Sequence, residues 1–115
     1  MLLTESEGKS VLSSAGIEVP EGFLARTARQ IARSPVPYPV AVKVQVASGG
    51  RGKAGGVAKA TSAEEATAAA ERMFGTRFGG ELPRAVLVEP WLAIERELYL
   101  SVGVEGRSGG YSVLY

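Results

Sequence analysis

The residues best suited to chemistry in this 115-residue chain are the cations and glycines of residues 40–57, VAVKVQVASGGRGKAGGV. Lys43 lies within an alternating apolar run, and Arg51 and Lys53 follow among five glycines. Ammonium and guanidinium groups bind phosphate oxygens, and glycine-rich backbone presents N–H groups to the same anion. The stretch therefore predicts a site for a polyphosphate.

Two strands are expected to position this loop. Valines at every second residue from Val40 predict a strand that carries Lys43 and Gln45 on its other face. A second strand is expected at residues 57–60, so the G-x-G-x-x-G spacing lacks the helix that a dinucleotide site requires, and Lys53 lacks the Ser or Thr of a Walker loop. A strand–loop–strand phosphate cover remains, with a solvated hairpin turn as the alternative.

Missing residue types exclude several kinds of chemistry. The sequence contains no cysteine and no histidine, and all twelve acids are glutamates. Disulfides, thiol nucleophiles and imidazole catalysis are therefore excluded, and metal ligands would have to be glutamates, carbonyls or hydroxyls. The chain has no apolar run of the roughly 20 residues that a membrane span needs and no signal segment. We expect one α+β domain in the cytoplasm.

Charge is distributed unevenly although the net charge is only +1. No acid occurs at residues 22–63, which hold seven cations, and the later residues turn acidic. This division favours a cleft ligand with phosphate at one end, against the alternative of ordinary solvated surface. Two non-catalytic functions also stay open: a structural interaction domain, and a nucleic-acid-binding module that uses the basic block from Arg26 to Lys59. The second is disfavoured because the block lacks interleaved aromatic residues.

Capping and turn residues locate the other elements. Thr4 and Glu7 form a capping box for a helix over residues 5–15 with an apolar stripe of Val11, Leu12 and Ala15, and Gly16 ends it. The remaining expectations, in chain order, are a short strand at 22–25, a brief helix from Thr27 to Arg33, a stiff proline spacer at 34–39, a helix at 63–74 with a Ser62/Glu65 capping box, a buried strand at 85–88, a strand at 97–105, and a final strand from 111. The chain stops inside that last strand, so we expect a fragment of a longer protein.

Four segments carry a resemblance to a known family: Val42 to Gln45, GGRGKAGGV at residues 49–57, Val86 to Glu89, and Glu97 to Leu100. Their order and spacing resemble the ATP-grasp region of the succinyl-CoA synthetase β subunit. The opening, residues 3–20, is more similar to that region in ADP-forming acyl-CoA synthetases. The resemblance implies an α+β fold: the first ATP-grasp subdomain, an antiparallel or mixed sheet with packed helices, plus the beginning of the second. It assigns 1–20 to the second subdomain, 21–90 to the first, and 91–115 to the truncated start of the second.

The resemblance also implies the site residues and the cofactors ATP or ADP and Mg²⁺. Lys43 matches the lysine that contacts the nucleotide phosphates, and the phosphate-covering loop matches Gly50, Arg51 and Gly52. Glu89 matches the hinge between the two subdomains, beside the base of the nucleotide, where Leu92 offers main chain. Glu97 matches the acid at the start of the next strand. Trp91 borders that base or packs in the core.

Much of the implied enzyme lies outside this chain. The family's magnesium ligands are an asparagine and an aspartate, which this sequence lacks, so no metal or catalytic residue is assigned here. The implied activity is that of an acid–thiol ligase, an ADP-forming acyl-CoA synthetase, working with a CoA-ligase α-type subunit or domain. The isolated fragment is expected to be inactive. Ala47-Ser48 and Pro90-Trp91 depart from the family pattern and leave the acid substrate open, and the choice of ATP over GTP is open as well.

Overall fold

A computed structural model describes residues 2–47, 55–104 and 109–114. The predicted loop residues 48–54 lie outside the described parts of the chain. The elements, in chain order, are α1 (Glu5–Ser14), β1 (Phe23–Ala25), the 3₁₀ helix η1 (Ala28–Arg33), β2 (Val40–Gln45), β3 (Val57–Ala60), α2 (Ala63–Phe74), β4 (Ala85–Pro90), β5 (Ser101–Val104) and β6 (Tyr111–Leu114). Helices are combined with antiparallel strands, as expected of an α+β fold.

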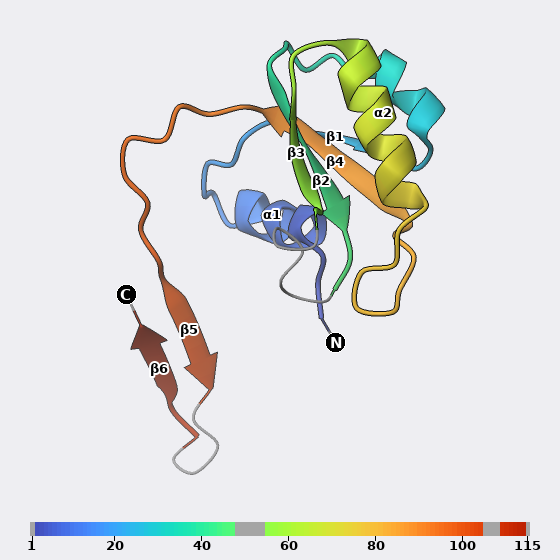
Figure 1. The fold of residues 1–115 in the computed structure, drawn as a ribbon. Coiled ribbons are helices and arrows are strands. Elements are labelled where there is room, and N and C mark those ends of the chain that lie inside the picture. Colours follow the sequence, from blue (N-terminus) through green and yellow to red (C-terminus); the bar gives the residue numbers. More distant parts are fainter. Residues whose placement is uncertain (1, 48–54, 105–108, 115) are drawn as a thin grey trace.

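The main sheet has four strands in the order β1, β4, β2, β3, and every neighbouring pair is antiparallel. Strands β2 and β4 form its centre (Figure 1). Their register pairs Lys43 with Leu87 and Ala41 with Glu89. Because side chains alternate between faces along a strand and opposed residues share a face, Lys43 and Glu89 project from the same side of the sheet.

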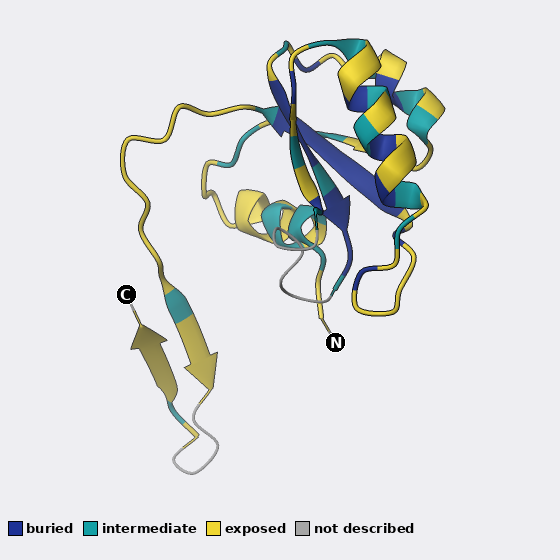
Figure 2. Ribbon diagram, in the orientation of Figure 1, coloured by how far each residue is buried: buried dark blue, intermediate teal, exposed yellow. Residues whose placement is uncertain are grey.

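One face of the sheet holds the hydrophobic core. Helices α2 and η1 lie over it in Figure 1, and Figure 2 shows β2 and β4 mostly buried. The alternating valines of β2, as predicted, point into this core with Val86 and Val88. From α2 come Ala66, Ala70 and Met73, all fully buried. The small alanines let α2 approach the strands closely, and burial of this apolar surface stabilises the sheet.

Helix α1 lies on the opposite side of the sheet from α2 (Figure 1). Its capping box is confirmed, since Thr4 Oγ1 accepts from the Glu7 N–H and the Glu7 carboxylate accepts from the Thr4 N–H. Gly16, with φ 84°, follows the C-cap as expected. The predicted apolar stripe, however, is not covered: no residue of α1 is buried, and Val11 is 59% exposed. Polar contacts must therefore fix its position.

Two predictions about helix N-termini need correction. Ser62 caps α2 by accepting from the Glu65 N–H, but Glu65 does not complete the predicted capping box. Its carboxylate accepts instead from the backbone N–H and hydroxyl of Thr61, at 2.7 and 3.0 Å. Thr27 precedes η1, yet its side chain makes no capping hydrogen bond.

The predicted strand over residues 97–105 is wrong in its first half. Residues 91–100 after β4 are exposed, and residues 97–100 are not strand; β5 begins only at Ser101. Strands β5 and β6 pair as the expected antiparallel hairpin, which stands apart from the main sheet (Figure 1). Leu98 and Leu100 are 83% and 67% exposed. An alternating pattern needs a covering layer to become a half-buried strand, and within the described residues these side chains have none.

Candidate functional site

The centre of the site is a lysine–glutamate pair on the two central strands. Lys43 Nζ lies 2.8 Å from Glu89 Oε1, and the Glu89 side chain is only 3% exposed. Gly22, in the lead-in to β1, packs closely against this side chain and contributes to its burial. There is no room for a side chain at Gly22, since a Cβ there would lie 2.8 Å from Leu87 Cδ1 and 3.4 Å from Glu89 Cγ. A carboxylate buried this deeply is costly unless cations compensate it.

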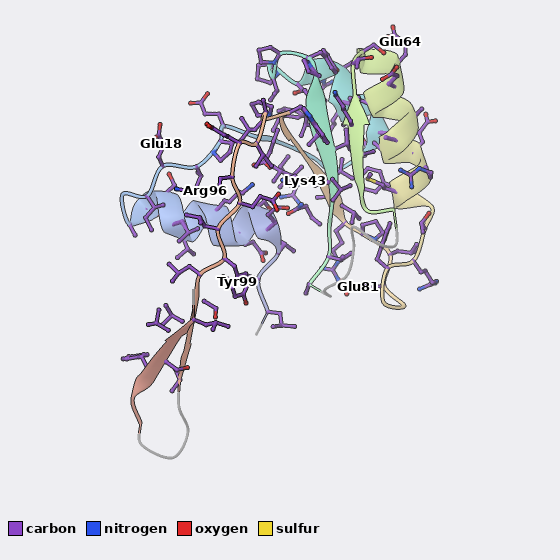
Figure 3. All side chains as sticks on the ribbon, turned by 60° about the vertical axis from the view of Figure 1, so that its left-hand side comes forward. Glu18, Lys43, Glu64, Glu81, Arg96 and Tyr99 are labelled. Atoms are coloured by element: carbon purple, nitrogen blue, oxygen red, sulfur yellow. The ribbon has the colours of Figure 1, made fainter. Side chains whose placement is uncertain are left out.

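Helix α1 supplies a second pair of opposite charges. Glu5 and Lys9 are one helical turn apart and their side chains meet at 2.8 Å. Lys9 Nζ also reaches Glu89 Oε2 at 2.5 Å, and Lys43 Nζ reaches Glu5 Oε1 at 3.0 Å. The four side chains form a closed ring of alternating charge, here called the ionic ring. Figure 3 shows Lys43 between the sheet and α1.

Gln45 attaches the first turn of α1 to the sheet. Its side-chain oxygen accepts from the Ser6 backbone N–H at 2.8 Å, and its amide nitrogen donates to the carbonyls of Lys43 and Val44. The residue is only 5% exposed. Because Gln45 lies two residues from Lys43 on the same face, one strand positions both the ammonium and the helix that contacts it.

The ring determines the charge state of Lys43. Burial lowers the pKa of this lysine, but hydrogen bonds to Glu89 and Glu5 and the charges of both carboxylates raise it above the ordinary value of 10.5. Lys43 is therefore an ammonium at neutral pH. Two ammonium groups and two carboxylates also leave the ring with no net charge when all four are ionised.

Two hydrogen bonds to backbone carbonyls hold the end of the glycine-rich loop that the structure describes. The Val44 N–H donates to the Gly56 carbonyl at 2.8 Å, and the Arg72 guanidinium of α2 donates to the Gly55 carbonyl at 3.0 Å. Gly55 has φ 83°, a conformation that favours glycine. The predicted cofactor-binding residues Gly50, Arg51 and Gly52 lie outside the described residues.

The structure does not bring every predicted site residue together. Leu92 and Glu97 lie on the exposed segment after β4, and among the described contacts neither is joined to Lys43 or Glu89. Trp91 is anchored, because its backbone N–H donates to the Pro39 carbonyl at 3.0 Å and the Lys59 ammonium lies 5.2 Å from its ring centroid. That places an aromatic ring and a cation at the end of β4.

A cleft of about 1120 Å³ lies between α1, the lead-in at 17–22 and the end of β4. Lys9, Leu87 and Glu89 are among the residues that line it. Within residues 2–47, 55–104 and 109–114, no cluster of three or more acidic, histidine or cysteine side chains is placed to hold a metal ion. No helix in those ranges is long and apolar enough to cross a membrane, and the cytoplasmic location stays a prediction.

Glu5 and Lys9 are site residues that the sequence reasoning missed. Their i, i+4 spacing predicts a local pair on one helix face. Nothing local indicates that Lys9 reaches Glu89, 80 residues further along the chain. That contact depends on how α1 crosses the sheet.

The fold and the ring define a class of protein. A glycine-rich loop between two antiparallel strands, with a lysine on a strand of the same sheet, is an arrangement that covers phosphate groups in other α+β domains. Comparison with known proteins gives the family: the chain belongs to the ATP-grasp domain family, whose sequence profile matches residues 2–114. The predicted resemblance and fold class are thus confirmed.

Curated relatives narrow the similarity. The chain is 37% identical to the succinate–CoA ligase (ADP-forming) subunit beta of Pyrobaculum aerophilum over 116 residues, 99% of this chain and 30% of the relative. For the subunit of the same name from Rubrobacter xylanophilus the identity is 42%, over 100% of this chain and 30% of the relative. The beta subunit from Natronomonas pharaonis is 41% identical, over 95% of this chain and 29% of the relative. The chain spans about 30% of the length of these relatives.

Proposed function

We propose that this chain is the nucleotide-binding portion of an ADP-forming acid–CoA ligase. The observation that carries the proposal is the position of Lys43: an ammonium on the central strand β2, which leads toward the glycine-rich sequence that begins at residue 49, in a chain whose residues 2–114 match the ATP-grasp domain family. The succinate–CoA ligase names of its relatives support an acid–CoA ligase over a nucleic-acid-binding module.

Each site residue is assigned a role within this proposal. The Lys43 ammonium binds nucleotide phosphate oxygens, and the backbone of Gly50, Arg51 and Gly52 covers them. Glu89 and Leu92 border the base, and Glu97, on the segment that precedes β5, faces the nucleotide. Transfer of a phosphoryl group depends on charge stabilisation and positioning, so a fixed ammonium is the main contribution of this chain.

Other parts of the enzyme must come from outside the chain. Mg²⁺, when bound, would supply neutralisation of phosphate charge, and the described residues offer no cluster of acidic, histidine or cysteine ligands for it. We place its ligands beyond residue 115. An α-type CoA-ligase subunit or domain supplies the CoA site and the phosphorylated histidine, because this sequence has no histidine. Residues 1–20 and 91–115 are proposed to join the second ATP-grasp subdomain.

The balanced reaction is carboxylic acid plus CoA plus ATP giving acyl-CoA, ADP and phosphate. The test is to supply the complete protein and its α-type partner with Mg²⁺, ATP, CoA and a panel of acids that includes succinate, and to measure ADP and thioester. Formation of both products in equal amounts supports the proposal. ATP binding without thioester for any acid would contradict the ligase assignment. Tight, salt-sensitive binding of RNA or DNA without nucleotide binding would favour the module instead.

A further inference from the structure

We propose that Glu5 and Lys9 of α1 tune the phosphate site in opposite directions: Glu5 competes with phosphate for the Lys43 ammonium, and Lys9 offsets the carboxylates that would otherwise repel phosphate. Both are positioning residues that act through Lys43 and Glu89. This inference rests on the proposed nucleotide site and assigns α1 a part in it.

The geometry places both Glu5 and Glu89 within ion-pair distance of Lys43. The Lys43 ammonium lies 3.0 Å from Glu5 and 2.8 Å from Glu89. An ammonium has three donors, and these two carboxylates occupy two of them; among the described residues no third partner is recorded. A phosphate oxygen can use the third donor directly. Stronger coordination requires one carboxylate to yield, and Glu5 is the more exposed of the two, at 16% against 3%.

Lys9 decides the net charge that an arriving anion meets. With Lys9 in place the ionic ring is neutral; without it, two carboxylates face one ammonium. Removal of Glu5 has the opposite effect and leaves two ammonium groups around Glu89. Partly buried charges a few ångströms apart are weakly screened, so one unit of charge in the ring changes the affinity for a polyphosphate.

The attachment of α1 agrees with an electrostatic role. No residue of this helix is buried, so apolar packing does not determine its position. Its described links to the sheet are the Ser6–Gln45 hydrogen bond and the ion pairs of Glu5 and Lys9. The side chains that hold α1 in place therefore include the ones that hold Lys43 and Glu89.

The test is calorimetric titration of ATP, ADP and adenosine into the complete protein at about 50 mM salt, where exposed charges are least screened. Glu5→Gln is expected to bind ATP about tenfold more tightly, and Lys9→Gln about tenfold more weakly, as one unit of charge at this range predicts. The double variant should return to within about threefold of wild type. Adenosine, which has no phosphate, should bind every variant with the wild-type affinity.

Controls separate charge from structure. Lys9→Arg keeps the cation and should preserve ATP affinity. Arg29→Gln and Glu95→Gln remove exposed charges outside the ring and should leave the affinities for ATP, ADP and adenosine unchanged. If Lys9→Gln fails to fold, Glu5→Gln alone decides, because lost structure does not tighten binding.

The inference is overturned if Glu5→Gln and Lys9→Gln shift ATP affinity in the same direction, or if adenosine affinity shifts as much as ATP affinity. Failure of the proposed function is a different result: the wild-type protein binds neither ATP nor ADP, or Lys43→Met leaves the ATP affinity unchanged.

Discussion

Replacement of Glu89 by glutamine tests whether the ionic ring stabilises the fold. The variant keeps the side-chain volume but leaves two ammonium groups facing one carboxylate. Removing one partner of a fully buried ion pair costs about 3–5 kcal/mol. Glu89 is 3% exposed, but its lysine partners are each 23% exposed. Solvent therefore screens part of the repulsion, and we expect a loss of about 2–3 kcal/mol.

Urea denaturation followed by circular dichroism measures this loss, and thermal unfolding should show a midpoint lower by about 8–12 °C for a domain of this size. Glu95→Gln, at an exposed position of the segment after β4, is the matched control and should change stability by less than about 0.5 kcal/mol. Adding Lys9→Met to Glu89→Gln restores the charge balance, so the double variant should lose less than the sum of the two single losses. A loss for Glu89→Gln below about 0.5 kcal/mol, the value typical of exposed pairs, would refute the reasoning.

Two further predictions concern the rest of the domain. Gly55→Ala should lower the free energy of unfolding by about 1–2 kcal/mol, because φ is 83° and the new Cβ would lie 3.1 Å from the Arg72 guanidinium. Gly8→Ala, in open space within α1, should instead raise it by up to about 1 kcal/mol. Urea denaturation measures both changes, and equal effects of the two variants would contradict this prediction. Hydrogen bonds from the Thr61 N–H and hydroxyl hold the pKa of Glu65 below 4.5, so its stabilisation is present above the unfolded pKa and lost as pH falls through the folded pKa. Carbon NMR of the Glu65 carboxylate should give a titration midpoint below 4.5, and a midpoint at or above 4.5 would be the contrary result. Glu65→Gln should flatten the dependence of stability on pH in that acidic range.

Local signals in the sequence were sufficient for most of the main sheet. The valine alternation of β2 predicted which face carries Lys43, and Gly16 marked the end of α1, because periodicity and capping depend on neighbouring residues. Local signals could not decide what covers an apolar face. The stripe of α1 and the alternation of 97–100 therefore predicted burial that the structure does not show.

The candidate site was predictable only in part for the same reason. Lys43 was found from its place before the glycine-rich loop, and Glu89 from the family resemblance. Their contact follows from the register of β2 with β4, which depends on the whole sheet. The contributions of Glu5 and Lys9 depend on the path of α1 across that sheet, which its own residues do not determine. Glu65 is a smaller example at the start of α2: its carboxylate accepts from the backbone N–H of Thr61, where the capping box predicted the neighbouring N–H of Ser62.

The most direct test of the central claim is calorimetric titration of ATP and ADP into the complete protein and its Lys43→Met variant, with circular dichroism to confirm that both are folded. The account predicts that wild type binds both nucleotides and that the variant loses at least about tenfold in affinity, since a charge-assisted contact to phosphate contributes about 1.5–3 kcal/mol. Arg29→Gln should bind as wild type does. Equal ATP affinity of folded Lys43→Met and wild type would contradict the assignment of this lysine, and with it the site.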